Sequence, residues 1–177
     1  MQRGFKIQGK VTELYDEYHV LIFKYILKMT KDVQLAEDLT HDTFLKLFDY
    51  LLDGKEIDYP KTFIYRMARN VTIDYLRKKN PLSKWKDMFW NTSWYSPSVE
   101  KIVEIRQDSL ELLELISMLR PPSYRDVVIL RKVEGFSIRE TAEILNWSES
   151  KVRVTLSRAM KKLEEKIHKG GVLSEQE

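Results

Sequence analysis

The segment 135–163 constrains the fold more than any other part of the sequence, because it carries start and stop signals for two short helices joined by a tight turn. Ser137 precedes a run of apolar residues at helical spacing, and Glu140 follows it by three residues, which is the pattern of a capping box. Asn146 is suited to end the first helix in a left-handed conformation, and Ser148 is suited to cap the second. The pattern predicts a helix-turn-helix.

The second of these helices has one apolar face and one free face. The apolar face repeats at helical spacing through Val152, Leu156, Ala159 and Leu163. No acidic residue occurs from Ser150 to Leu163, so the free face offers the donors that a helix needs in order to read a major groove. We expect DNA contacts from Ser148, Ser150, Lys151, Arg153, Val154, Ser157, Arg158 and Lys161. The alternative is an ordinary amphipathic helical hairpin with a solvated basic face.

The chain as a whole is predicted to be all-α. Six glycines and five prolines in 177 residues leave few turns for a β-rich fold, and a hydrophobic share of 43% is enough to bury a core. Apolar residues recur at helical spacing over residues 11–29, 34–52, 61–79, 98–119 and 124–133. On the third of these helices the expected apolar face consists of Ile64, Met67, Ala68, Val71 and Tyr75.

The order of these helices indicates two small helical domains joined by an aromatic-rich linker. We expect a first domain over residues 1–80, a linker over 81–97, a second domain over 98–170 and a tail over 171–177. The linker holds Trp85, Phe89, Trp90, Trp94 and Tyr95. These aromatic residues are too many for a passive spacer. We expect the rings to dock on one of the domains, and the alternative is that they bind a partner or a DNA strand.

Charge is segregated along the chain. Residues 32–58 hold eight acidic side chains against Lys46 and Lys55, whereas residues 66–86 hold seven basic side chains against Asp74. An acidic surface between two basic ones indicates a protein that contacts nucleic acid in two places and a different partner in between. A set of solvated helix faces would give the same composition.

The sequence has no pattern typical of catalysis or metal binding. It contains no cysteine, and His19, His41 and His168 are scattered without the spacing of metal ligands. Gly-rich phosphate loops and nucleophile elbows are also missing. We therefore expect no enzyme activity, no metal site and no cofactor. No stretch has the apolar length of a signal peptide or a membrane span, so we expect a cytoplasmic protein without direct membrane insertion.

Three stretches, in order along the chain, resemble one known family. Residues 35–48 and 62–79 resemble the second conserved region of the extracytoplasmic-function (group 4) sigma factors of the sigma-70 family. Tyr124 and Arg125, followed by residues 135–142, resemble their fourth region, and the resemblance covers roughly residues 10–168. It implies a two-domain initiation factor that joins core RNA polymerase. The first domain would open and read the minus-ten element, and the second would read the minus-35 element as duplex DNA.

The resemblance also implies roles for individual residues in DNA binding. In the second domain, Arg153, Val154, Ser157 and Arg158 point the same way as the groove-facing positions of similar sigma factors, and the other expected contacts are better placed for phosphates. In the first domain, the loop 53–60 would wall a base pocket and the Asn70 amide would pair with a base edge. Without the resemblance, Asn70 would be taken for a solvent-exposed polar residue. The implied minus-ten contacts are Arg66, Arg69, Asn70, Asp74, Arg77 and Lys78.

Core polymerase is expected to bind the acidic second helix. The resemblance implies that a coiled coil of the polymerase's largest subunit contacts Asp38, Leu39, Asp42, Phe44 and Asp49. Promoter DNA and an anti-sigma factor, which could be membrane-anchored, are the other implied partners. The chain departs from the usual family pattern in having Phe63 in place of a Trp, His41 in place of a Gln, and the run Leu119, Arg120, Pro121 and Pro122 in place of a Leu-Pro pair.

One other class of function stays open from the sequence. The chain could be an autonomous helix-turn-helix transcription regulator whose N-terminal half binds a ligand or forms a dimer. Such a regulator binds its operator alone, whereas a sigma factor binds DNA weakly unless polymerase is present.

Overall fold

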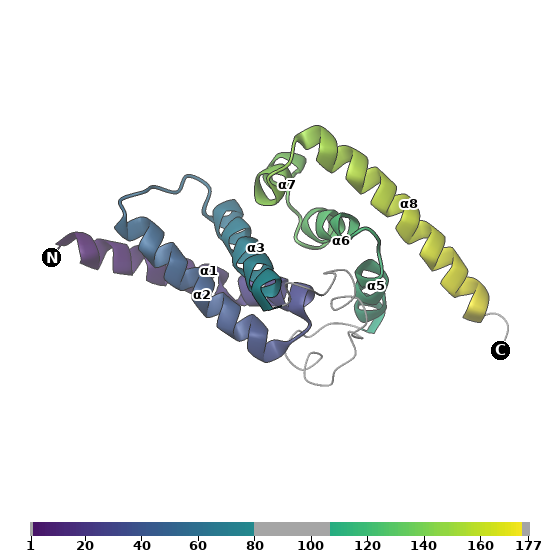
Figure 1. Ribbon diagram of the computed structural model, residues 1–177, viewed down its shortest axis with the longest axis horizontal. Coiled ribbons are helices and arrows are strands. Elements are labelled where there is room, and N and C mark those ends of the chain that lie inside the picture. Colours follow the sequence, from purple (N-terminus) through teal and green to yellow (C-terminus); the bar gives the residue numbers. More distant parts are fainter. Residues whose placement is uncertain (1, 80–106, 175–177) are drawn as a thin grey trace. The chain divides into compact units, whose positions relative to one another are not determined.

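The computed structural model describes residues 2–79 and 107–174, and the chain divides into two compact units, Met1–Phe89 and Trp90–Glu177 (Figure 1). All regular structure in the described residues is helical, so the predicted all-α class is confirmed. The linker aromatics and the predicted helix start at residue 98 lie outside the described residues. Among the described helices, none combines the length and the apolar character that a membrane crossing requires.

The first unit is built from three long helices that pack on one another: α1 (Gln2–Thr30), α2 (Val33–Leu52) and α3 (Pro60–Lys79). The break predicted between the first two helices is present. Lys31 has a positive φ of 56°, and the side chain of Asp32 then accepts a hydrogen bond from the Leu35 amide at 3.0 Å, which caps α2. Helix α1 begins well before residue 11, where apolar spacing predicted its start. The buried centre of the unit is made by Ile22, Ile26, Leu27, Leu39, Leu47, Ile64 and Tyr65.

The buried face of α3 is rotated relative to the prediction. Tyr65 is only 1% exposed and its ring centre lies 4.9 Å from that of Tyr25 on α1, whereas the predicted core residues Met67 and Tyr75 are half-buried. Thr72 is also fully buried, and its hydroxyl donates to the Ala68 carbonyl at 2.8 Å, which offsets the cost of burying a polar group. Helix α3 contacts both α1 and α2, so it buries a wider face than the apolar residues alone indicate.

The second unit consists of shorter elements around the predicted helix-turn-helix. They are α5 (Gln107–Ser117), α6 (Pro122–Val128), a π-helical turn η1 (Ile129–Val133), α7 (Ile138–Leu145) and α8 (Glu149–Ser174). The segment predicted as one helix over 124–133 therefore changes its hydrogen-bond pattern at Ile129, where the Glu134 amide donates to the Ile129 carbonyl at 2.9 Å. The core residues Leu119, Val127, Leu130, Phe136, Ile144, Val152 and Ala159 are buried.

Candidate nucleic-acid interface

Helix α7 is fixed at its start by a reciprocal pair of hydrogen bonds. The Glu140 amide donates to the Ser137 hydroxyl at 3.1 Å, and the Ser137 amide donates to the Glu140 carboxylate at 2.7 Å. The predicted capping box is thus confirmed. The Arg131 guanidinium on η1 donates to the Phe136 carbonyl just before the cap, which ties the helix-turn-helix to the preceding turn.

The turn between α7 and α8 is as tight as the sequence predicts. Asn146 takes the left-handed conformation, with φ 54° and ψ 49°, and the Trp147 amide donates to the Ala142 carbonyl at 2.9 Å. The Ser148 hydroxyl then accepts from the Lys151 amide at 3.2 Å and caps α8. One end of the turn is therefore held by a backbone hydrogen bond and the other by the Ser148 side chain, so the first turns of α8 have a defined direction.

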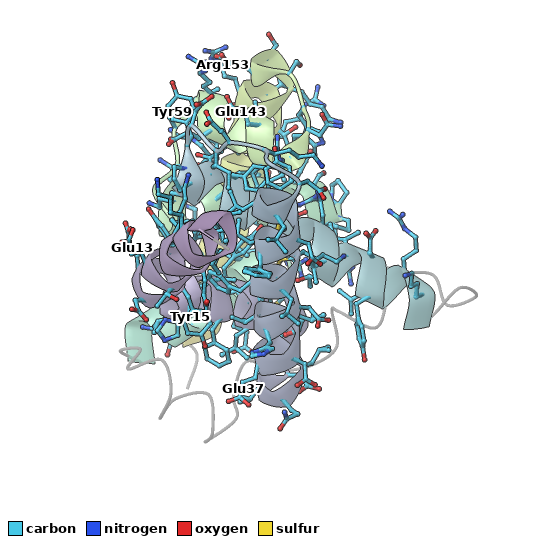
Figure 2. All side chains as sticks on the ribbon, turned by 90° about the vertical axis from the view of Figure 1, so that its left-hand side faces the viewer. Glu13, Tyr15, Glu37, Tyr59, Glu143 and Arg153 are labelled. Atoms are coloured by element: carbon cyan, nitrogen blue, oxygen red, sulfur yellow. The ribbon has the colours of Figure 1, made fainter. Side chains whose placement is uncertain are left out.

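Helix α8 separates its buried and exposed faces as expected. Val152, Ala159 and Leu163 are buried in the second unit and Leu156 is half-buried. All eight side chains predicted to contact DNA are exposed, including Val154, which keeps 49% of its surface accessible. Figure 2 shows the labelled Arg153 at the outer surface of the helix-turn-helix. Within the described part of the second unit, this face of α8 is therefore accessible.

Two cations at the start of α8 are held by residues four positions earlier. An Nη atom of Arg153 lies 2.9 Å from a carboxylate oxygen of Glu149, and the Lys151 ammonium lies 4.3 Å from the centre of the Trp147 ring. Sequence reasoning missed Glu149 and Trp147, although their i, i+4 spacing to a cation was a usable signal. By contrast, Arg158 makes no ion pair with any residue that the structure describes.

The first unit contains a pocket of about 290 Å³ between α2 and α3. Its lining residues are Lys46, Tyr50, Phe63, Arg66, Met67, Asn70 and Val71. The loop 53–60, which was expected to wall a base pocket, contributes none of them. All of the lining residues come from α2 and α3. Tyr50 on α2 and Phe63 on α3 face each other across the helix pair, with ring centres 4.6 Å apart.

The pocket combines aromatic rings with positive charge. The Arg66 guanidinium lies 5.2 Å from the centre of the Phe63 ring, and Lys46 adds a second cation to the lining. Outside the lining, the Lys55 ammonium lies 5.0 Å from the centre of the Tyr50 ring. Aromatic faces beside cations can stack an unpaired base and hold its phosphate. The exposed side chain of Asn70 adds an uncharged amide on the same lining, with donors and acceptors suited to a base edge.

The other residues predicted for this interface do not line the pocket. Arg77 and Lys78 are exposed, and Arg69 is half-buried. Arg77 lies 3.7 Å from Asp74, so Asp74 pairs with a cation of its own helix. The structure therefore brings together Arg66 and Asn70 from the predicted set and adds Lys46, Tyr50 and Phe63. Among the described residues, no cluster of His, Cys, Asp or Glu side chains could hold a metal ion.

The acidic face of α2 is present, but two residues predicted for it are not on the surface. Asp38, Asp42 and Asp49 are exposed, whereas Leu39 is 2% exposed and Phe44 is 5% exposed. Leu39 and Phe44, which were predicted to contact polymerase, belong to the apolar stripe that α2 buries in the first unit. The Phe44 ring meets the Tyr15 ring of α1 edge-on, with ring centres 4.9 Å apart. Figure 2 labels Tyr15 on α1 and, on the exposed side of α2, Glu37.

Comparison with known proteins gives two family matches. The Sigma-70 region 2 family matches residues 14–81, and the Sigma-70, region 4 family matches residues 109–163. The chain is 30% identical over 156 residues to the ECF RNA polymerase sigma factor SigX of Bacillus subtilis, covering 85% of this chain and 79% of SigX. It is 29% identical over 173 residues to the RNA polymerase sigma factor YlaC of the same organism, covering 93% of this chain and 95% of YlaC.

Two solved structures share the fold. The sigma factor RpoE, in complex with the anti-sigma factor NepR from Bartonella quintana, matches with a TM-score of 0.68 and 20% identity, covering 90% of this chain and 95% of RpoE. CnrH, in complex with the cytosolic domain of CnrY, matches with a TM-score of 0.65 and 18% identity, covering 99% of this chain and 95% of CnrH.

Proposed function

The chain belongs to the extracytoplasmic-function sigma factors of the sigma-70 family, which act in transcription initiation, and on this basis we propose how its two units divide the task. Residues 1–80 act as sigma region 2 and residues 98–170 as sigma region 4. The observation that carries the proposal is that each matched segment holds one nucleic-acid-facing feature. The first holds the pocket between α2 and α3, and the second holds the donor-rich face of α8.

Helix α8 enters the major groove of the upstream promoter element. Arg153 and Arg158 donate to guanine, since an arginine fork matches guanine O6 and N7, and Val154 packs on a thymine methyl group. Ser157 hydrogen-bonds to a base edge in the same groove. Ser148, Ser150, Lys151 and Lys161 bind phosphates and set the register of the helix on the duplex.

The pocket of the first unit holds a base of the minus-ten element after the strands separate. The base stacks against Tyr50 and Phe63, and the Asn70 amide hydrogen-bonds to its exposed edge. Lys46 and Arg66 lie on the same lining and neutralise the adjacent phosphates. Arg69, Arg77 and Lys78 extend this positive surface along α3, and Asp74 orients Arg77.

Core RNA polymerase binds the acidic face of α2. Asp38, Asp42 and Asp49 are exposed charges on one helix, and they suit a basic surface on the polymerase. Leu39 and Phe44 support this face from inside by fixing α2 against the rest of the unit. An anti-sigma factor is a further partner, because RpoE is found in complex with the anti-sigma factor NepR. CnrH is found in complex with the cytosolic domain of CnrY, and by analogy we propose that the partner of this chain is membrane-anchored.

The chain itself has no catalytic activity and acts in the cytoplasm, where transcription takes place. The test is run-off transcription with purified bacterial core polymerase on a promoter library, with and without the chain. We expect promoter-specific transcripts only when the chain is added, and co-purification of the chain with core enzyme. A chain that does not co-purify, or that binds its duplex equally well without polymerase, is instead an autonomous regulator.

A further inference from the structure

The ion pair between Glu149 and Arg153 lies at the start of the helix that we assign to the groove. The contact is 2.9 Å long and joins residues one helical turn apart, with the acid on the N-terminal side, which is the favoured order for such a pair. Both side chains remain about half accessible, at 58% for Arg153 and 45% for Glu149. The pair therefore lies on the exposed face of α8 and is not part of the core.

One carboxylate oxygen of Glu149 engages one Nη atom of Arg153, and the other N–H groups of the guanidinium stay available. An arginine has five such donors in a rigid plane, and two of them are enough for a bidentate contact with guanine. A free exposed arginine must give up many side-chain conformations when it binds. An arginine already held by a carboxylate loses fewer of them, so it binds in one orientation at a lower entropic cost.

We propose that Glu149 is a positioning residue that sets the base preference of this protein, by holding the Arg153 guanidinium toward a guanine of the upstream element. The proposal rests on the function assigned to α8 above. Glu149 also places a negative charge beside the DNA, which weakens attraction to phosphates in general. Glu149 therefore lowers the affinity for DNA in general and raises the discrimination between bases.

A simpler explanation for Glu149 is that it stabilises the start of α8, because an acidic side chain interacts favourably with a helix N-terminus. That role would affect folding and would change recognition at every base position together. A positioning role through Arg153 changes the preference at one position only. The chain offers a matched control in Glu143 on α7, which pairs with Arg139 at 3.6 Å with the same i, i+4 spacing and lies outside α8.

The experiment uses the full chain bound to bacterial core RNA polymerase and a pool of promoter duplexes in which the upstream segment is randomised. Bound DNA is sequenced for the wild type, Glu149→Gln, Arg153→Ala, the double variant and Glu143→Gln. We expect Arg153→Ala to flatten one guanine preference by roughly fivefold or more, the loss typical of a bidentate contact. Glu149→Gln should reduce the same preference by about threefold while total bound DNA rises. The double variant should match Arg153→Ala, and Glu143→Gln should match the wild type.

Three results would overturn the proposal. The first is an unchanged preference profile in Glu149→Gln. The second is a Glu149→Gln effect that persists in full when Arg153 is already Ala, because the two residues would then act independently. The third is a loss of preference at all positions together with a lower unfolding temperature, which assigns Glu149 to helix stability. A wild-type chain that selects no upstream sequence at all overturns the proposed function as well, so the two failures are distinguishable.

Discussion

The ammonium group of Lys151 lies 4.3 Å from the centre of the Trp147 ring, across the first turn of α8. Trp147 lies in the turn between α7 and α8, and its backbone amide donates to the Ala142 carbonyl. The contact with this ring favours one position for the charge of a long, flexible side chain. We propose above that Lys151 contacts a phosphate, and the ring contact favours one position of its ammonium group for that role.

We predict that Lys151→Gln weakens binding of the polymerase-bound chain to all duplexes by a similar factor. The plot of log affinity against log salt should become less steep by about 0.9, the value for one lost phosphate contact. Trp147→Leu should give a smaller loss in the same direction, and Trp147→Phe should keep part of the effect because a ring remains. Lys162→Gln is the control, since Lys162 already pairs with Glu165 at 3.6 Å. A loss confined to one DNA sequence would assign Lys151 to a base.

Arg158→Ala should weaken binding to the preferred upstream element by about 1–3 kcal/mol, if Arg158 makes a bidentate contact with a base. Arg158→Lys keeps the charge but lacks the planar fork, so it should lose most of the same discrimination. Affinities for duplexes with single base substitutions, measured on the polymerase-bound chain, distinguish the outcomes. An equal loss on every duplex would place Arg158 on the phosphate backbone.

The double variant Asp38→Ala and Asp42→Ala should fold normally and lose affinity for core polymerase. Both side chains are exposed, so their removal leaves the core of the first unit intact. Co-purification with core enzyme gives the affinity, and circular dichroism gives the helix content. The control is Glu164→Ala with Glu165→Ala, which removes two exposed acids from α8. Unchanged affinity of the Asp38 and Asp42 double variant for core polymerase would show that polymerase binds another face of the protein.

Leu39→Ala should destabilise the protein by about 2–5 kcal/mol, because Leu39 is almost fully buried and a cavity would form around the smaller side chain. Chemical denaturation followed by circular dichroism measures this change. The exposed neighbour Leu45, which is 54% accessible on the same helix, provides the control in Leu45→Ala. Equal stability of the two variants would contradict the packing described for α2.

Asn70→Ala should spare the closed complex and impair promoter opening, because we propose that the pocket holds a base only after the strands separate. Permanganate footprinting on duplex promoters measures the opening. The defect should shrink, without vanishing, on a template whose minus-ten segment is already mismatched. A normal bubble and equal defects on both templates would make Asn70 an ordinary surface residue.

Local signals in the sequence were enough to predict the start of α2 and both ends of α7. Ser137, Glu140 and Asn146 act on backbone groups within a few residues, so their roles depend little on the rest of the fold. The same holds for Asp32 at the start of α2. These residues explain why the helix-turn-helix could be predicted closely from a single sequence.

Contacts between helices were harder to predict. Charge on α2 correctly indicated an exposed face, but the family resemblance added Leu39, which is buried, to the expected polymerase contacts beside Asp38. The pocket depends on Tyr50 and Phe63 meeting across two helices, which no local pattern contains. A role for Glu149 was not predicted, because this residue lies one position before the acid-free stretch from which the DNA contacts of α8 were predicted.

The π-helical turn at Ile129–Val133 has a consequence for how this protein can evolve. A π turn corresponds to an α-helix with one residue inserted, and each residue of an α-helix turns the chain by about 100°. Deleting a single residue there would allow α6 to continue as an ordinary helix and would re-aim the segment that leads into α7. The number of residues in this turn therefore determines the direction of the helix-turn-helix relative to α6. One-residue insertions and deletions at η1 should change the direction of the helix-turn-helix relative to α6 while every side chain of α8 stays unchanged.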